Sequence, residues 1–528
     1  MTAMASDEYF DDDIADAENR WLPPVAPRVS SDDQSDSDSD HRYERYRHRR
    51  HGWTDEQAWR AGFIGDADYA FLLISPHVSC FNEDGRPMVE ISWNKRAMTL
   101  QMEDRRLSAI IDGLFWGHAD KHLSSAARHT VLRILTNEAV MAPAQVMELR
   151  TALTADGQVC IDLGRGQVAT FDKGLALTSD APVRFRPAPP LPTPQGPPDL
   201  MRLRDYLNVD DDGFQLIIAW LTFSLLPFGP YPVLHLIGQH GAAKSTISRF
   251  LRYLLDGRFT PGGGRPDEMR DLDVRARHQH GLFFDNQSNL PDPVADKICR
   301  MSTGGDDSRR ANYSDDKLIA FEARRPVVIT SIVNIITQAD LADRALVIEL
   351  NPVREKGFRT EAELHGAFKR DAPQIMSGIL HLIADGLTNR PLTPASDLPR
   401  MADFAHWALA IEPVFWKPGS FMAAFARNHD ASANDILEDD PVAQGIFALL
   451  DAQAGFWQGT ASELLVEIRT LLDRRGQHRH ANMPRQPRSL SERLTRLEPE
   501  LRKKGIAVSR QRVTAASVKQ IIIQRLNG

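Results

Sequence analysis

From residue 200 onward, the chain alternates short apolar runs with longer amphipathic segments. Four of these runs are bounded by polar residues, which is typical of buried strands in a mostly parallel sheet. The stretch Leu216–Leu226 and the pattern over residues 360–427 predict helices. The alternation therefore predicts an α/β core. Its four predicted strands are Val233–Ile237, Leu282–Phe284, Pro326–Ile329 and Leu346–Leu350.

The residues before this core mix short strands with short helices. Arg86–Trp93 and Gln158–Asp172 predict strands, with Asp-Gly and Gly-Arg-Gly as turns. Leu107–Leu114 and Ala126–Leu135 predict helices. The sequence of this region has no acidic triad and no metal-binding motif. It predicts an α+β N-terminal domain and leaves the role of that domain open.

The last segment predicts three helices followed by strand-like runs at Ile506–Val508 and Val518–Gln524. Ser489 is expected to cap the second helix of a helix–turn–helix pair. This order is that of a winged helix, in which basic side chains on the second helix and in the wing contact DNA. An oligomerisation or docking module of the same fold is the alternative. The candidate DNA contacts are Arg493, Arg496, Arg510 and Arg512.

A proline-rich stretch separates the first of these regions from the core. Residues 181–198 hold eight prolines, which predicts a stiff, extended linker and a domain boundary. A ligand for an SH3-type domain is the alternative. The predicted divisions are 1–52 (tail), 53–180 (α+β domain), 181–199 (linker), 200–352 (α/β core), 353–433 (helical region) and 434–528 (winged-helix-like domain).

Charge is distributed unevenly along the 528 residues. The net charge is -8, and the contents of 42% apolar and 25% charged residues are ordinary for a globular chain. Residues 1–40, however, carry twelve acidic residues and two arginines, whereas residues 471–528 carry fourteen Lys/Arg against four Asp/Glu. The asymmetry indicates a polyanion partner near the C-terminus, with a solvated charged surface as the alternative.

The first 52 residues have the composition of a disordered tail. The repeat Ser35–Asp40 is of low complexity, and His41–His51 is a basic stretch with three histidines. A flexible charged tail is the simpler interpretation, and metal binding by the histidines is the alternative. The acidic N-terminus has no apolar run that would make a secretory signal.

Two further features of the sequence favour the cytoplasm. The three cysteines, Cys80, Cys160 and Cys299, are far apart and odd in number, so no disulfide framework or zinc spacing follows from them. The longest apolar stretch, Phe214–Leu226, is too short and too mixed to span a bilayer. We therefore expect a protein without a membrane partner.

The strongest motif is a glycine-containing loop between a strand and a helix. The strand Val233–Ile237 leads into Gly-Gln-His-Gly-Ala-Ala-Lys-Ser, and apolar residues then recur at helical spacing. Gly238 and Gly241 let backbone amides curl around an anion, and the helix N-terminus adds partial positive charge. The context is that of a phosphate-binding loop for ATP. The candidate ATP-binding residues are Gly238, Gln239, His240, Gly241, Ala242, Ala243, Lys244, Ser245 and Thr246.

Two residues of this loop have chemical roles, and one departs from the usual pattern. Lys244 is expected to reach the β- and γ-phosphates, and Ser245 to ligate Mg²⁺. Ala243 stands where glycine usually precedes the lysine. We expect the loop to tolerate alanine with lower affinity.

An acidic residue ends the next predicted strand. Asp285 follows Leu282–Phe284 and stands where a Walker B aspartate would hold Mg²⁺. The next residue is Asn286, whose amide can orient water but cannot accept its proton. The identity of the catalytic base is therefore open. Glu268 and Asp271 are candidates, although nothing in the sequence shows that they lie near Asp285. A scaffold that binds nucleotide and hydrolyses it slowly or not at all is the alternative.

The segment after residue 302 combines glycines, basic residues and an aromatic residue. Ser302–Gly305 is followed by Arg309, Arg310, Tyr313 and Lys317, which suits a hairpin that touches a nucleic-acid backbone. A solvated loop is the alternative. On the DNA interpretation, Arg309, Arg310 and Lys317 are the contacts.

Two further residues are candidates for catalysis. Thr330 ends the strand that begins at Pro326, where a sensor side chain would contact the γ-phosphate. Arg344 precedes the strand Leu346–Leu350 and is placed to face a neighbouring subunit as an arginine finger. A structural ion pair between Asp343 and Arg344 is the alternative.

The order of these motifs resembles that of AAA+ ATPases of the superfamily 3 helicase type. More closely, it is similar to bacterial and phage ATP-binding proteins related to plasmid and phage primase-helicases. The similarity runs from about Phe71 to the C-terminus, is densest over residues 205–350, and includes Arg400–Ala408. It implies Walker A roles for Lys244 and Ser245, a Walker B role for Asp285, a sensor role for Thr330, a second-acid position at Asn286 and an arginine finger at Arg344.

The resemblance also implies an assembly. It implies a homo-oligomeric ring, a hexamer, with single-stranded DNA in the pore and Arg309 and Arg310 on a pore-facing hairpin, while the C-terminal domain is placed to bind duplex DNA. The first hypothesis is an ATP-driven DNA translocase or helicase that replicates a phage, plasmid or integrated element. A ring ATPase that signals without unwinding, and a nucleotide-binding scaffold, are the alternatives.

Overall fold

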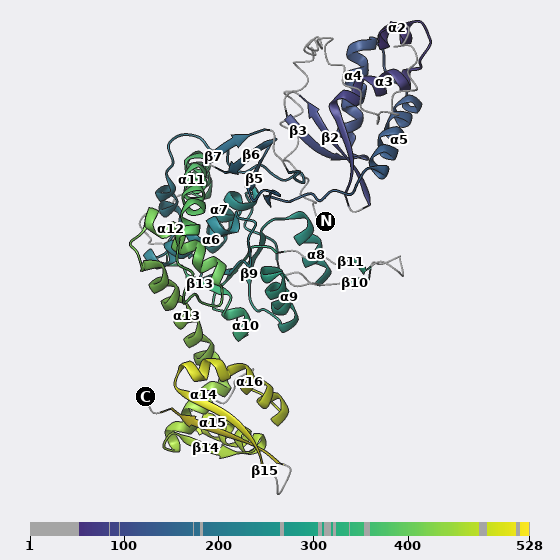
Figure 1. Cartoon of the computed structure of the whole chain (residues 1–528). Coiled ribbons are helices and arrows are strands. Elements are labelled where there is room, and N and C mark those ends of the chain that lie inside the picture. Colours follow the sequence, from purple (N-terminus) through teal and green to yellow (C-terminus); the bar gives the residue numbers. More distant parts are fainter. Residues whose placement is uncertain are drawn as a thin grey trace. The chain divides into compact units, whose positions relative to one another are not determined.

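The computed structural model forms two compact units, Met1–Met147 and Glu148–Gly528 (Figure 1). Predictions for residues 1–51, for Glu268 and for Lys317 lie outside the described residues, as do the side chains of Arg309, Arg310 and Arg512. The described residues are 52–83, 85–93, 96–172, 174–179, 183–264, 269–304, 309–310, 318–319, 324–336, 338–352, 360–474, 483–513 and 518–526.

The first unit is a three-stranded antiparallel sheet with helices packed on it. Helix α5 contacts β1 and β2, and its buried residues Val131, Leu135 and Ala139 recur every fourth position, as one face of a helix requires. The predicted strand Arg86–Trp93 and both predicted helices are confirmed. The elements are α2 (Asp55–Arg60), α3 (Asp66–Ile74), η3 (Ser75–His77), β1 (Val78–Glu83), β2 (Arg86–Trp93), β3 (Arg96–Gln101), α4 (Arg105–Ala119) and α5 (Ser125–Met141).

The second unit begins with an antiparallel meander of four strands. Its strands are β4 (Thr151–Leu153), β5 (Val159–Gly164), β6 (Gln167–Phe171) and β7 (Leu175–Thr178), in that order. The predicted N-terminal domain ending at residue 180 is therefore wrong at its boundary. The reason is packing, because inward-facing residues of β5 and β6 join the hydrophobic core of the second unit.

The proline-rich segment belongs to the second unit and is not a spacer. Leu191 is 3% exposed, and its N–H donates to the carbonyl of Leu163 at 3.0 Å. The fully buried Arg150 donates to the carbonyl of Pro189 at 2.7 Å. The linker prediction failed because composition indicates an extended backbone but not whether other residues pack against it.

The central sheet has four parallel strands in the order β13-β8-β12-β9. All four predicted strands are confirmed. Their C-terminal ends, after Ile237, Gln287, Ser331 and Glu349, define what we call the carboxyl edge, and their first residues define the amino edge. The strands are β8 (Val233–Ile237), β9 (Leu282–Gln287), β12 (Val327–Ser331) and β13 (Ala345–Glu349).

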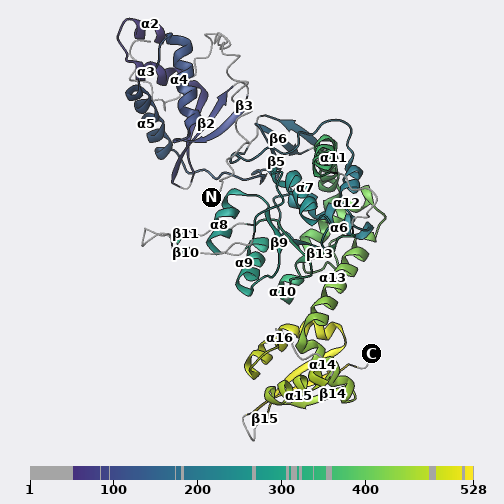
Figure 2. The ribbon, with the colours of Figure 1, turned by 180° about the vertical axis from the view of Figure 1, so that it is seen from behind.

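Helices cover both faces of this sheet (Figures 1 and 2). Leu234 and Leu236 of β8 face one cluster, whereas Val233 faces the other, because side chains alternate along a strand. The first face carries α6 (Asp211–Ser224), α7 (Lys244–Asp256), α11 (Glu361–Asn389), α12 (Ala402–Phe415) and α13 (Ser420–Asp439), and η4 (Leu200–Tyr206) packs on α11. The second carries α8 (Met269–His278), α9 (Asp292–Thr303) and α10 (Ala339–Ala342). A short turn, η5 (Arg390–Leu392), joins α11 to α12.

Strand β13 lies at one side of the sheet, and Asn428 satisfies its outer backbone by bonding both the N–H and the carbonyl of Val347. The short strands β10 (Arg309–Arg310) and β11 (Leu318–Ile319) pair antiparallel, so the predicted hairpin is confirmed in its backbone.

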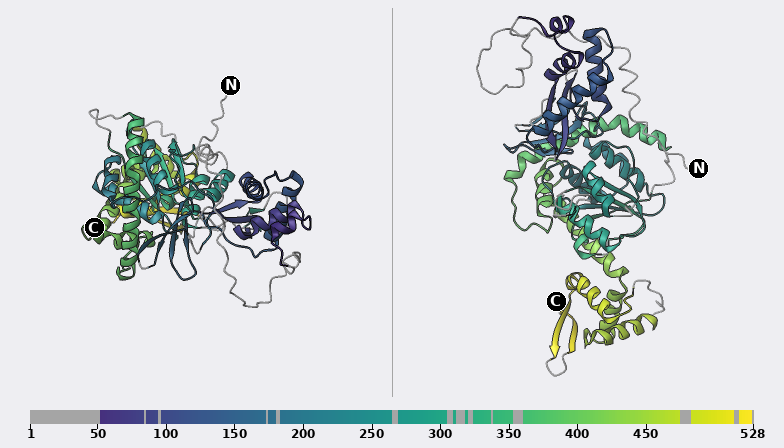
Figure 3. Two further views of the ribbon diagram at one scale, coloured as in Figure 1. Left: turned by 90° about the horizontal axis from the view of Figure 1, so that it is seen from above. Right: turned by 90° about the vertical axis from the view of Figure 1, so that its right-hand side faces the viewer.

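The C-terminal part combines helices with a three-stranded antiparallel sheet of order β14-β16-β15. The yellow hairpin of β15 and β16 stands beside its helices in the right-hand view of Figure 3. Ser489 does not cap a helix: α16 begins at Pro487, whereas Thr460 caps α15 by accepting from the Glu463 N–H. The elements are α14 (Pro441–Ala452), β14 (Phe456–Gly459), α15 (Ala461–Arg474), α16 (Pro487–Lys503), β15 (Ile506–Val513) and β16 (Val518–Arg525). Among the described helices of the chain, none has the length and apolar character needed to span a bilayer.

Candidate functional site

The loop from β8 to α7 lies at the carboxyl edge of the sheet. Gly238 is closely enclosed, because a Cβ there would lie 3.0 Å from that of Ala242 and 3.3 Å from that of Leu350. Gly241 has φ +81°, and Ala243 has φ 58° and ψ 24°, both in the left-handed region. The loop thus turns tightly at two positions before α7 begins at Lys244.

The side chain of Lys244 bonds back to the start of this loop. Its Nζ donates to the carbonyls of Gly238 at 2.7 Å and Gln239 at 2.9 Å. Burial lowers the pKa of the Lys244 ammonium, and the negative charge of Asp285 opposes that shift. Gln239 and His240 are exposed, and Ser245 and Thr246 are half-buried in the first turn of α7. The loop therefore presents one positive charge at the N-terminus of a helix.

Asp285 is held by a hydroxyl from the neighbouring strand. Thr330 on β12 is fully buried, and its Oγ1 donates to Asp285 Oδ1 at 2.6 Å. The same oxygen accepts from the N–H of Asn286 at 2.8 Å. Asn286 is exposed and has φ 53°, so the chain turns away immediately after the carboxylate. Thr330 therefore fixes the carboxylate, and its hydroxyl bonds to both Asp285 and Asn286.

The carboxyl edge thus brings together Lys244, Asp285 and Thr330, whereas Arg344 lies elsewhere. The carbonyl of Arg344 accepts from the N–H of Val233, the first residue of β8. Arg344 is therefore at the amino edge, roughly 13 Å along the strands from the loop, at about 3.3 Å per residue. Within one chain it cannot act on the same site as Lys244.

Arg344 is tied into a group of charges at the amino edge. Its guanidinium bonds to Asp340 and also to the Cys299 sulfur at 2.6 Å. The thiol of Cys299 donates to Asp340 Oδ2 at 3.2 Å, and burial raises its pKa to about 11. The expected alternative, an ion pair between Arg344 and Asp343, is wrong in its partner, because the carboxylate one helical turn earlier lies closer.

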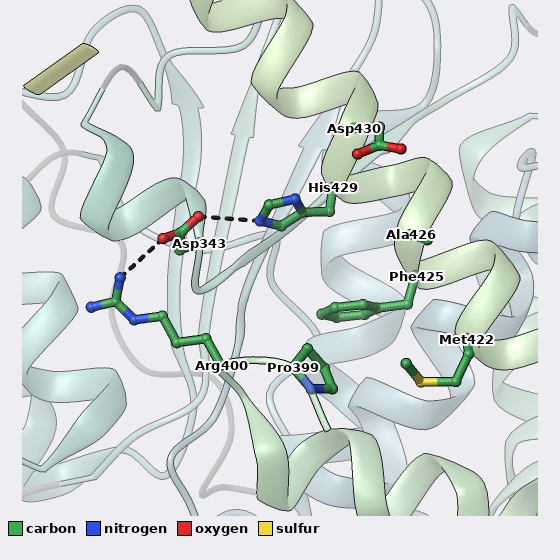
Figure 4. A pocket seen from close by; sticks show the side chains of 8 residues that line it. All are labelled: Asp343, Pro399, Arg400, Met422, Phe425, Ala426, His429 and Asp430. Carbon is green, nitrogen blue, oxygen red and sulfur yellow. Dashed lines mark hydrogen bonds and ion pairs between the residues drawn. The ribbon is translucent and has the colours of Figure 1, made fainter. Parts of the chain in front are cut away.

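Asp343 is instead the centre of a second set of contacts (Figure 4). It bonds to Arg400 at 3.0 Å, to His429 at 3.1 Å and to Lys503 at 3.6 Å. The hydrogen bond from His429 is the largest cause that lowers the pKa of Asp343 to about 2. Because Arg400 also bonds Asp340, the two acids and their partners form one network at the amino edge.

A pocket of about 390 Å³ lies beside this network (Figure 4). Its polar wall comes from Asp343, Arg400, His429 and Asp430, and its apolar wall from Pro399, Met422, Phe425 and Ala426. Its charged side chains from the network already have opposite charges as partners. The pocket is therefore distinct from the carboxyl edge in both position and chemistry.

Three predicted DNA contacts of the C-terminal part form ion pairs that differ in how deeply they are buried. Arg493 bonds at 2.5 Å to Asp440, whose side chain is only 3% exposed and caps α14. Arg496 bonds to Asp292 at 2.9 Å, and Arg510 bonds to Glu498 at 2.9 Å. Arg493 therefore has a structural role, whereas the side chain of Arg496 remains 55% exposed.

Sequence reasoning missed Asn208, which touches the loop from outside. Its Nδ2 donates to the carbonyl of Ala242 at 3.0 Å and also to the carbonyl of Asn351. Gln287 was missed as well, and its amide donates to the carbonyl of Asp285 at 2.6 Å. Asn208 precedes the helix α6 without any motif, so only the fold brings it to the loop.

These elements define a mixed α/β protein with a parallel sheet between helices and polar groups at its carboxyl edge. Residues 198–434 match the family model of the actinomycete integrative conjugative element replication protein. Residues 442–528 match the model of the C-terminal domain of the same replication protein, RepA. The larger part of the chain is therefore similar in sequence to replication proteins of conjugative elements.

Solved structures and curated proteins add less. The A form apo structure of the NrS-1 C-terminal region is 12% identical, with a TM-score of 0.40 over 86% of this chain and 98% of that one. Another apo structure of the NrS-1 C-terminal region, residues 305–718, is 11% identical, with a TM-score of 0.40 over 88% of this chain and 100% of that one. Cdc6p from Pyrobaculum aerophilum is 17% identical, with a TM-score of 0.17 over 63% of this chain and 92% of that one. No curated protein matches the chain.

Proposed function

We propose that the chain is an ATP-driven replication protein of an integrated element, and that it moves along DNA as a homo-oligomeric ring of the superfamily 3 helicase type. The observation that carries this proposal is the meeting of Lys244, Asp285 and Thr330 at one edge of the sheet. The sequence match over residues 198–434 supports a role in replication. Lys244 supplies positive charge, and Asp285 supplies a carboxylate from the strand two positions away in the sheet.

The residues at this edge fit ATP and Mg²⁺. A triphosphate needs backbone amides and a cation, which the loop over residues 238–244 and the N-terminus of α7 provide. Mg²⁺ prefers hard oxygen ligands, which Ser245 and Asp285 carry. When bound, the ion neutralises charge on the phosphates. The chain's own contribution is to hold Asp285 rigidly through Thr330 and to place the exposed amide of Asn286 where it can orient water.

The C-terminal part is proposed to bind DNA as a winged helix. Its three helices and three-stranded sheet support this, with α16 as the recognition helix. Arg488 and Arg496, whose side chains are 89% and 55% exposed, are the cations of α16 that we place at the DNA. Arg510 and Arg512 remain the proposed contacts of the wing, whereas Arg493 is held by Asp440 and serves the fold. Arg309, Arg310 and Lys317 remain the proposed contacts of the ring pore.

The test is the rate of ATP hydrolysis with Mg²⁺, measured with and without single-stranded DNA. We expect DNA to raise the turnover of the wild type and Lys244→Ala to abolish it. Lys417→Ala, which removes an exposed lysine from another part of the same unit, is the control and is expected to behave as the wild type. A rate of hydrolysis that single-stranded DNA leaves unchanged would contradict the translocase proposal.

A second candidate is an ATP-switched assembly that does not unwind DNA. Asn286 favours it, because an amide cannot accept a proton from water at the position after Asp285. Arg344 also favours it, since its guanidinium is held by Asp340 and Cys299. ATP binding without turnover in the same assay would make this candidate the leading one.

A further inference from the structure

We infer that Asn208 is a positioning residue that holds the phosphate-binding loop in its anion-accepting conformation. This inference rests on the proposed function of that loop. The Asn208 side-chain amide has two N–H donors, and both are used, one on Ala242 of the loop and one on Asn351 after β13. The carbonyl of Asn208 also accepts from the Asn351 N–H at 2.8 Å.

Asn208 is itself held rigidly. Its neighbours Leu207 and Val209 are 4% and 6% exposed and belong to the core. The next residue, Asp210, caps α6 by accepting from the Gly213 N–H at 2.7 Å, and its carbonyl accepts from Arg204 at 2.8 Å. The side chain of Asn208 therefore reaches the loop from a fixed backbone.

The bond to Ala242 determines the direction of one loop amide. In a trans peptide the carbonyl and the following N–H point in opposite directions. Because the carbonyl of Ala242 points to Asn208, the N–H of Ala243 points away from it, to the other side of the loop. Backbone N–H groups turned this way are those that an anion at a helix N-terminus accepts from. Asn208 thus fixes one donor of the proposed phosphate site.

The loop needs this support because Ala243 is strained. It adopts φ 58° and ψ 24°, a conformation that L-residues other than asparagine and aspartate rarely take. Such a residue persists only where its surroundings over-determine it. Rotation of the peptide between Ala242 and Ala243 would relieve the strain and turn the amide away. The bond from Asn208 opposes that rotation.

The experiment measures the Kd of ATP by titration calorimetry for the full chain and four variants. Asn208→Asp keeps the shape and removes both donors, so we expect its Kd to rise about 10-fold, and Asn208→Ala to do the same without added charge. Asn351→Asp is the matched control, because Asn351 is exposed and contributes only its backbone to the contacts. We expect its Kd to stay within about twofold of the wild type.

The fourth variant separates positioning from a general loss of structure. Adding Ala243→Gly to Asn208→Asp removes the strain that drives the rotation, so it is expected to restore several-fold of the lost affinity. The inference is overturned if Asn208→Asp binds ATP as Asn351→Asp does, or if glycine restores nothing. If the wild type itself fails to bind ATP, the proposed function fails, which is a different result from either of these.

Discussion

The two edges of the central sheet differ in whether their charged residues form ion pairs. At the carboxyl edge, Lys244 bonds to backbone carbonyls and Asp285 to a hydroxyl, and neither forms an ion pair with a described side chain. At the amino edge, Asp340 and Asp343 are contacted by Arg344, Arg400, Lys503 and the ring of His429, which come from four parts of the chain. Charges left without an opposite partner are available to a ligand, whereas closed networks hold segments together. The difference favours the carboxyl edge for the proposed ATP site and gives the amino edge a role in holding segments of the unit together.

As the pH falls, the chain should first lose the stability contributed by two buried histidines and only later that contributed by the amino edge. Burial lowers the pKa of His235 and of His280 to about 3, from 6.5 in the unfolded chain. The unfolded state therefore binds more protons below pH 6.5, and stability that is complete above that pH is lost as it falls toward 3. Asp343, with a pKa of about 2 against 3.8, loses its contribution only below 3.8.

The expected loss at pH 5 is about 2 kcal/mol for each histidine, or about 4 kcal/mol together. Urea unfolding at pH 7, 6 and 5 measures it. His280→Gln should remove about half of this pH dependence, and His240→Gln, at an exposed position in the loop, should leave it unchanged. If the free energy of unfolding is flat between pH 7 and 5, the two histidines are not buried as neutral groups.

Substitutions at the two edges should separate ATP binding from stability. Lys244→Ala is expected to raise the Kd of ATP roughly 100-fold, because a charge-assisted contact to the phosphates is lost. Arg344→Ala is expected to leave the Kd of the isolated chain within about twofold and to lower stability through Asp340 and Cys299. Calorimetric titration of both variants measures this. Equal losses of affinity would contradict the separation of the edges.

Within the amino edge, Asp343→Asn tests whether the network stabilises the fold. Its partners Arg400 and Lys503 are 46% and 41% exposed, so water screens part of the interaction. We therefore expect a loss of about 1–2 kcal/mol. Asp430→Asn, in the same pocket, is the control and should change stability by less than about 0.5 kcal/mol. Urea midpoints that coincide for the two variants would show that the network contributes nothing.

The sequence predicted the parts of the fold that depend on local pattern. The four central strands and the helix after the loop were found because apolar runs and helical spacing are written in adjacent residues. The unit boundary at Met147 was not, because composition marks the prolines but not the packing of β5 and Leu191 on the core. Hydrophobic pattern therefore locates elements better than it locates domains.

For the candidate site too, the sequence predicted what local motifs mark and missed what depends on tertiary contacts. Lys244 and Asp285 carry motifs and meet at one edge, whereas the role of Thr330 depends on which strand lies between theirs. The partner of Arg344 depends on the turn that precedes β13, which brings Asp340 and not Asp343 to it. Asn208 has no motif at all. Interactions across the sheet require the strand order, which no single segment encodes.

The smallest expected effect concerns the loop itself and has an internal control. Ala243→Gly should stabilise the chain by about 0.5–1 kcal/mol, because the left-handed conformation costs alanine about 1–2 kcal/mol, and the greater freedom of glycine when unfolded offsets part of this. Ala242→Gly is the same change one residue earlier, where φ is negative and the methyl group is buried. It should destabilise by about 1 kcal/mol. Opposite signs in urea unfolding at equal slope would locate the strain at one residue of the carboxyl edge. If both changes destabilise the chain, Ala243 is not strained, and Asn208 has nothing to oppose.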